Sequence, residues 1–198
     1  MTGTSEPVPL EDPDPELTDG IVHLRAWRAG DLNCVRRASR DERILEATTV
    51  PARFSEEAGR AFIRRQQQRT ERGQGWSLAV VDIASRTAIG NVVLLRRPQP
   101  GVAGIGYWIV PEARGCGAAS RAVGLLATWG TDQAGFARVE AWVEPDNVGS
   151  IRVLERCGFV REGRLRSFLT FPDRRADAWV YSRVRGPSGP TAGVPSPS

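Results

Sequence analysis

Apolar and polar residues follow two different periods along this chain, and the change from one period to the other predicts an α/β domain. Alternating runs predict strands, whereas apolar residues spaced three or four positions apart predict helices. In chain order the predicted elements are a strand at 20–27, helices at 31–40 and 55–73, strands at 76–83, 88–95 and 105–110, a helix from 119 to about 134, a strand at 137–143, a helix at 147–157, and strands at 159–170 and 176–184. Residues 41–54 show no regular pattern.

The order of these elements predicts part of the topology. The strands at 76–83 and 88–95 flank a short polar turn and are expected to form a hairpin. The helix after the strand at 105–110 is expected to be a right-handed crossover, which makes that strand parallel to the one at 137–143. Asp31 is a candidate side-chain cap for the first helix. We therefore predict one α/β domain over residues 19–185.

The two ends differ in composition from this domain. Residues 1–18 are rich in Pro, Glu and Asp and show no periodicity, so we expect a disordered acidic tail. Residues 186–198 (GPSGPTAGVPSPS) are uncharged and rich in Pro, Gly and Ser, which predicts a second disordered tail.

The charge of the chain bears on which ligands it could bind. Lysine is absent and all 27 basic residues are arginine, giving a net charge of +4. Six acids and no base fall in residues 1–19, so the rest of the chain is strongly basic. A polyanionic ligand would suit this surplus, and so would a solvated basic face without a ligand.

Other function classes are disfavoured. No apolar run approaches the roughly 18 residues that cross a membrane, and the acidic N-terminus does not resemble a signal peptide, so we expect a cytoplasmic protein. Cys34, Cys116 and Cys157 are too widely spaced for a disulfide framework, and with the single histidine, His23, they do not suggest a metal site. Nucleic-acid binding has no supporting motif beyond the arginine surplus.

Residues 104–130 (GIGYWIVPEARGCGAASRAVGLLATWG) form the most informative stretch. A strand leads through Arg114-Gly115-Cys116-Gly117-Ala118-Ala119 directly into a helix. Glycines let the backbone approach a ligand, and the first N–H groups of a helix bind anions, so this stretch predicts an anion cradle. The alternative is an ordinary strand-to-helix turn.

A second motif follows the strand at 137–143. Asn147 is placed to cap a short helix, with Ser150 three residues later. Ile151, Leu154 and Cys157 form its apolar stripe, and Gly158 is the expected left-handed residue at its end.

Together these two motifs resemble the GNAT acyltransferases, in particular the RimJ/RimL-like branch. The resemblance rests on Arg114-x-x-Gly117-x-Ala119 after Tyr107-Trp108, and on Asn147-x-x-Ser150 followed by residues 157–163 (CGFVREG). It covers about residues 20–184. It implies a GNAT fold: a mixed, mostly antiparallel twisted sheet of about seven strands, one central parallel crossover and about four helices. It also implies acetyl-CoA as cofactor, bound where strands 104–110 and 137–144 splay apart.

The resemblance further implies roles for individual residues. A bulge near Ile109 and Val110 would leave a backbone N–H free to hold the thioester carbonyl. Arg114 and Arg121 would add charge beside the pyrophosphate. The backbone groups expected to bind the pyrophosphate are those of Gly115, Cys116, Gly117, Ala118 and Ala119. Asn147 and Ser150 would contact the cofactor.

Transfer of an acyl group to an amine also needs an acid for the leaving thiolate and a route for the amine proton. Ser150 is the candidate acid, with helix capping as its alternative role. Tyr107 is a candidate for acid and substrate-binding roles, or else a core residue. Related sequences often carry Glu where this chain has Gly104. The remaining candidate bases are Glu140, unless it is simply charge-paired, and Glu144; Asp177 is a candidate to hold the substrate amine. Water could also relay the proton.

The resemblance therefore implies an acyl-CoA-dependent N-acetyltransferase acting on a protein N-terminus or a small-molecule amine. Arg64, Arg65 and Arg69 leave room for a succinyl-type donor. The change at Gly104 leaves room for a catalytically silent acyl-CoA-binding domain. No membrane partner is expected, and a homodimer is an open option.

Overall fold

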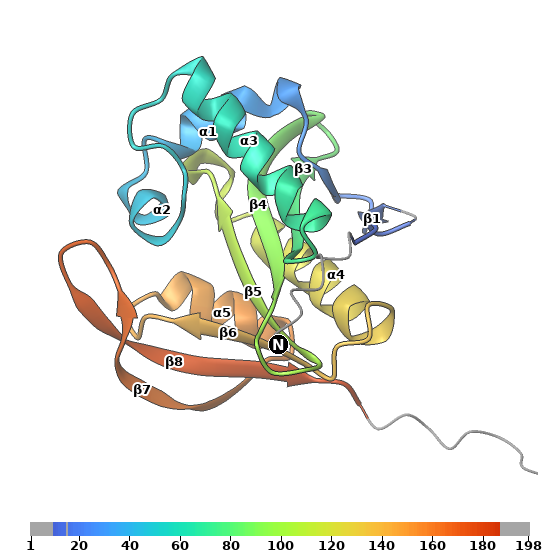
Figure 1. Cartoon of the computed structure of the whole chain (residues 1–198), viewed down its shortest axis with the longest axis vertical. Coiled ribbons are helices and arrows are strands. Elements are labelled where there is room, and N and C mark those ends of the chain that lie inside the picture. The colour runs from blue at the N-terminus through green and yellow to red at the C-terminus, as the bar shows by residue number, and fades with distance from the viewer. Residues whose placement is uncertain (1–9, 15, 187–198) are drawn as a thin grey trace, which may run out of the picture.

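The computed structural model describes residues 10–14 and 16–186. Its centre is an eight-stranded sheet in the order β1-β2-β3-β4-β5-β6-β8-β7 (Figure 1). The strands are β1 (Leu17–Thr18), β2 (Val22–Ala26), β3 (Gly75–Asp82), β4 (Thr87–Arg96), β5 (Val102–Ile109), β6 (Arg138–Val143), β7 (Val160–Thr170) and β8 (Arg175–Val184). The helices are α1 (Leu32–Ala38), α2 (Glu42–Ala47), α3 (Glu56–Glu71), α4 (Ala118–Asp132) and α5 (Val148–Arg156).

Most predicted elements are confirmed, and the count rises by one strand and one helix. The β3–β4 hairpin is antiparallel as predicted. α2 lies inside 41–54, where no element was expected, because its six residues are too short to establish a helical period. Within the described residues no helix is long and apolar enough to cross a membrane.

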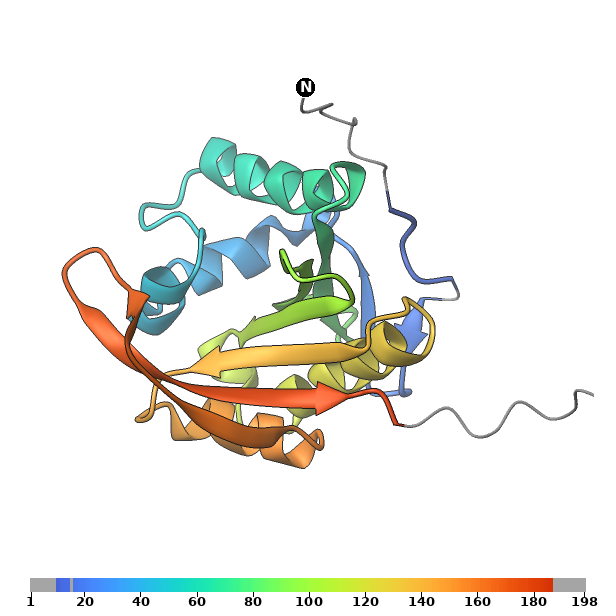
Figure 2. The ribbon, with the colours of Figure 1, turned by 60° about the horizontal axis from the view of Figure 1, so that its bottom comes forward.

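Helices cover both faces of the sheet (Figure 2). On one face, Ser77 of β3 donates a hydrogen bond to Gln66 of α3 at 2.9 Å. On the other face, Leu94 of β4 lies against Gly130 of α4, where an added Cβ would come within 2.7 Å of Leu94 Cδ2. Side chains alternate across a strand, so β4 supplies core residues to both layers.

β5 and β6 form the predicted parallel pair, but only three residues of each are paired. The register joins residues 102–104 to residues 138–140. β5 continues to Ile109 and β6 to Val143 without further pairing to each other. The strands therefore separate in the middle of the sheet, as expected from the predicted splay.

The N-terminal segment differs from the predicted disorder. Residues 1–9 and 15 lie outside the described part, but Trp76 Nε1 donates to the Glu11 carbonyl at 2.7 Å and Leu10 N–H donates to the Thr70 carbonyl at 3.0 Å. Pro13 is buried, and β1 pairs with β2. The composition of residues 1–18 does not indicate these contacts, and those of Leu10 and Glu11 are made with residues distant in sequence.

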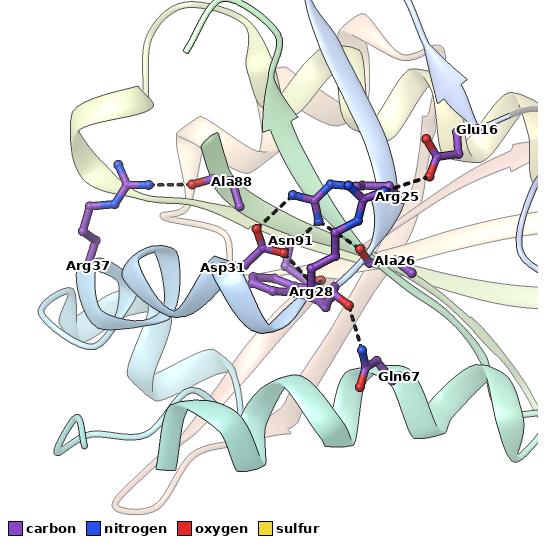
Figure 3. Close-up of polar contacts among 10 residues, drawn as sticks. Glu16, Arg25, Ala26, Arg28, Asp31, Arg37, Gln67, Ala88 and Asn91 are labelled. Carbon is purple, nitrogen blue, oxygen red and sulfur yellow. Dashed lines mark hydrogen bonds and ion pairs between the residues drawn. The ribbon is translucent and has the colours of Figure 1, made fainter. Parts of the chain in front are cut away.

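Asp31 does not cap α1 with its side chain. Its carboxylate accepts hydrogen bonds from Arg25 Nη1 and Nη2 at 2.7 and 2.9 Å and from the Arg28 N–H at 2.8 Å (Figure 3). Arg25 and Asp31 are both buried, so the ion pair is shielded from water. It fixes the turn that leads from β2 into α1.

Candidate active site

The separation of β5 and β6 is flanked by two cavities of similar size. The first has a volume of about 490 Å³ and lies among the end of β5, the turn into α4, α2 and α5. The second, of about 460 Å³, lies among α3, α2, β4, β5, β6 and the β7–β8 hairpin. Both are lined by Ala47, Thr48, Tyr107, Trp108, Asn147 and Ser150. The cavities therefore meet at Tyr107 and Ser150.

The N-terminus of α4 opens into the first cavity without a side-chain cap. The first helical hydrogen bond runs from Arg121 N–H to the Gly117 carbonyl, which leaves the N–H groups of residues 118–120 outside the helical ladder. Gly115 and Gly117 have φ of 83° and 85°, a backbone region that favours glycine. By contrast, side chains cap α2, α3 and α5. The predicted cradle is thus an uncapped helix start facing a cavity.

The predicted loop residues are not all placed alike. Gly115, Gly117, Ala118 and Ala119 line the first cavity. Cys116 is not among the lining residues; it is exposed, and its thiol donates to the Ala113 carbonyl.

Arg114 lines the cavity but is held by the protein. Its Nε donates to the Ile109 carbonyl at 2.8 Å, and its Nη1 lies 2.8 Å from Asp41, the N-cap residue of α2. Partial burial works to raise the pKa of Asp41, but the hydrogen bonds from Arg114 and the Ile44 N–H hold it below its ordinary value. Arg114 therefore fastens the loop to α2.

The other predicted phosphate-side arginine is placed elsewhere. Arg121 pairs with Asp19 at 2.6 Å and does not line the cavity. Arg43, Arg152 and Arg156 line it instead, are exposed, and form no ion pair with a described residue. Arg152 and Arg156 are four residues apart and so share one face of α5. This spacing can be recognised in the sequence.

The predicted bulge near Ile109 and Val110 is absent. The β4–β5 register runs without a shift from Arg96↔Ala103 to Gly90↔Ile109, and Val110 N–H donates to the Ile89 carbonyl at 2.9 Å. In an antiparallel ladder alternate residues bond to the same neighbour, so the N–H groups of Tyr107 and Ile109 point away from β4. They face the side where the β6 pairing has already ended. The splay itself exposes these donors.

Tyr107 and Ser150 are joined at the meeting point of the cavities. The Tyr107 hydroxyl donates to the Ser150 carbonyl at 3.1 Å, and burial raises the pKa of Tyr107, which keeps the phenol protonated. Asn147 Oδ1 accepts from the Ser150 N–H at 3.1 Å and so caps α5. The Ser150 hydroxyl makes no hydrogen bond with any residue in the described ranges. Capping therefore does not require this hydroxyl.

Glu140 and Asp177 line neither cavity. Glu140 lies 3.4 Å from the Nε atoms of both Arg97 and Arg138. It is therefore a charge-paired residue of the sheet, which was the alternative to a base. Asp177 lies 2.5 Å from Arg164 and accepts the Ser167 N–H at 2.7 Å, bracing an irregular part of the β7–β8 pair. Neither placement supports the predicted base or amine-binding role.

Gly104 leaves room for an arginine. A Cβ at this position would lie 2.5 Å from Arg97 Nη2, and the Arg97 guanidinium stacks on Trp142 at 3.8 Å. The space beside Gly104 is therefore occupied by a guanidinium.

The carboxylates of the second cavity are Glu46 and Glu144. Arg174, in the turn between β7 and β8, bridges them, with Nη1 2.5 Å from Glu144 and Nη2 3.4 Å from Glu46. Glu144, a predicted candidate base, thus lines the cavity in an ion pair.

Comparison with known proteins agrees with this architecture. Residues 22–160 match the sequence model of the acetyltransferase (GNAT) domain. The chain is 32% identical over 115 residues to probable N-acetyltransferase YjcK of Bacillus subtilis, covering 57% of this chain and 64% of YjcK. It is 36% identical over 87 residues to uncharacterized N-acetyltransferase p20 of Bacillus licheniformis, covering 44% of this chain and 49% of p20. The matches thus span about half to two thirds of these relatives.

Solved structures extend the likeness to the whole fold. A GNAT-family acetyltransferase of Bacillus anthracis superposes with a TM-score of 0.75 at 20% identity, over 86% of this chain and 98% of that one. Mycobacterium smegmatis RimJ in complex with CoA-disulfide superposes with a TM-score of 0.73 at 21% identity, over 85% and 84%. Because the family model covers more than half of the sequence, this chain belongs to the GNAT acetyltransferase family.

Proposed function

We propose that the protein transfers an acetyl group from acetyl-CoA, bound in the first cavity, to a primary amine that enters from the second cavity. The amine nitrogen forms a bond to the acyl carbon, the carbon–sulfur bond breaks, and the amine proton is lost as the thiolate gains one. A protein N-terminus or a small-molecule amine would serve as acceptor. The uncapped start of α4 is the observation that carries this proposal.

The residues around the first cavity fit an acyl-CoA. Backbone N–H groups of residues 118–120 would bind the pyrophosphate, since a helix start attracts anions through its free donors and its dipole. Arg43, Arg152 and Arg156 add positive charge to the same walls. The solved RimJ structure of this fold holds a CoA-disulfide, which supports a CoA ligand here.

The meeting point of the cavities supplies the chemistry. The N–H groups of Tyr107 and Ile109 would donate to the thioester oxygen as negative charge develops on it, an effect typically worth about 3–4 kcal/mol per donor. The free hydroxyl of Ser150 would protonate the leaving thiolate. Holding both reactants in line contributes further, because effective molarity is worth about 7–11 kcal/mol.

Gly117→Glu tests the cofactor assignment. The substitution places a carboxylate at the helix start, in a backbone conformation that L residues rarely adopt. Acetyl-CoA affinity, measured by isothermal titration, should fall by at least about tenfold.

Gly135→Glu is the matched control. Gly135 also has positive φ (79°) and open space around it, but it lies beyond the end of α4 and lines neither cavity. Both variants should lose similar stability, and only Gly117→Glu should lose binding. Equal affinity in wild type and Gly117→Glu would remove the phosphate-site assignment. Tight binding without CoA release on a broad amine panel would favour the silent acyl-CoA-binding domain.

A further inference from the structure

The second cavity contains a positive charge that no described residue neutralises. Phe62, Gln66 and Arg69 follow each other at helical spacing on α3 and line this cavity. Gln66 is hydrogen-bonded to Ser77 and to the Phe62 carbonyl. Arg69 makes no side-chain hydrogen bond or ion pair within residues 10–14 and 16–186, and its Nε is buried without a partner.

The carboxylates of the cavity do not supply the missing partner. Glu46 and Glu144 are both paired with Arg174. Burial, and then the like charge of Arg65, lower the pKa of Arg69. An anion beside Arg69 would offset both effects, since an opposite charge favours the cationic form.

The remaining walls define the rest of the ligand. Phe62, Trp108, Trp142 and Phe171 contribute aromatic side chains to the lining of the cavity. Its volume of about 460 Å³ falls within the range of small-molecule sites, about 300–1,000 Å³, and far exceeds what a two-carbon acyl group fills. Arginine matches the planar carboxylate group through paired N–H donors.

We propose that the acceptor is an amine with an apolar body and a carboxylate, and that Arg69 binds this carboxylate in the second cavity. The amine then points toward Ser150, where the two cavities meet. This inference rests on the proposed function, because it assigns the second cavity to the acceptor. A carboxylate on a longer acyl group, as in succinyl-CoA, is the competing source of the anion. Arg69 lines only the second cavity, which favours the acceptor.

Ligand binding tests the inference without catalysis. N-acetyl-L-phenylalanine and N-acetylphenethylamine differ only by the carboxylate, and their affinities are measured by isothermal titration in the absence of CoA. Wild type should bind the carboxylate compound at least about tenfold more tightly. Arg69→Gln should remove this preference. The control Arg64→Gln should keep it, since Arg64 lies on the same helix, is exposed and lines neither cavity. Absent or equal binding of the two compounds in wild type overturns the inference, as does a preference that survives Arg69→Gln.

Turnover separates the two sources of the anion. With acetyl-CoA, L-phenylalanine should be a better acceptor than phenethylamine, and Arg69→Gln should remove the difference. Loss of succinyl-CoA turnover in Arg69→Gln, with no change in the acceptor preference, would assign Arg69 to the acyl group and overturn the inference. Failure to bind acetyl-CoA would instead contradict the proposed function, and the titration above would still decide the role of Arg69.

Discussion

Ser150 shows how one residue can serve two roles through different atoms. Its backbone N–H donates to Asn147, whereas its hydroxyl has no hydrogen-bond partner among the described residues and lies where the two cavities meet. The backbone role supports α5, and the hydroxyl is available for chemistry. Substitution of the side chain should therefore separate the two.

Ser150→Ala should lower kcat by about 100-fold while changing acetyl-CoA affinity and Tm little, because only the proposed proton donor is lost. Steady-state kinetics and thermal unfolding measure both effects. Asn147→Ala is the comparison, since it removes the cap of α5 and should cost about 0.5–2 kcal/mol of stability. An unchanged kcat in Ser150→Ala would assign the residue a structural role alone.

The residue scale is also where sequence-based prediction was least complete. The glycine loop leads directly into a helix as predicted, because its conformation depends on adjacent residues. Glu140 and Asp177 line neither cavity, and two of their partners, Arg97 and Arg164, are brought to them only by the folding of the sheet. Arg69 carried no local signal, since only the fold shows which arginines of α3 lack a partner.

At the scale of elements, apolar periodicity predicted the strands and the longer helices. It missed α2 and β1, which have six and two residues and so contain too few repeats of their period. It also could not predict that β5 and β6 pair over only three residues, since this depends on where side chains from other elements fill the space.

The carboxylate of Glu162 connects the three strands β6, β7 and β8. Glu162 of β7 pairs with Arg138 of β6 at 2.6 Å and accepts a hydrogen bond from Ser182 of β8 at 2.6 Å. These contacts, with that to Arg138 the largest, lower the pKa of Glu162 from 4.5 to about 2. Its contribution to stability is therefore fully present above about pH 4.5 and is lost as the pH falls toward 2.

Glu162→Gln should lower the free energy of unfolding at pH 7 by up to about 1 kcal/mol, a modest value because the carboxylate is partly exposed. Wild type and variant should converge as the pH falls below 3. Thermal unfolding from pH 7 to pH 2.5 measures the difference. Glu71→Gln serves as control, because Glu71 is exposed and has no ion pair among the described residues. A difference that does not depend on pH would contradict the assigned contacts.

At the scale of the whole molecule, the acidic N-terminal segment belongs to the folded body from residue 10 onward. Glu11 is bound by Trp76, β1 extends the sheet, and Glu16 lies 2.6 Å from His23. The segment therefore closes the edge of the sheet beside β2.

A chain that begins at residue 19 should melt several degrees below one that begins at residue 10, since it loses these contacts and about 1 kcal/mol shifts Tm by roughly 2–4 °C in a protein of this size. Differential scanning calorimetry measures the shift. Equal melting temperatures would show that residues 10–18 contribute nothing to the folded state.

The strand order has a consequence for how the chain is made. β8 is the last strand of the described residues, yet it lies between β6 and β7 in the sheet. During synthesis, β5, α4, β6 and α5 emerge before β8. The edge of β6 that pairs with β8 is still unpaired at that stage. An unpaired edge is a template for association with other chains, so β6 is exposed to aggregation until residues 175–184 arrive. A chain that stops after β7 would contain every residue of the proposed cofactor site. It would still lack β8, the strand that covers the edge of β6.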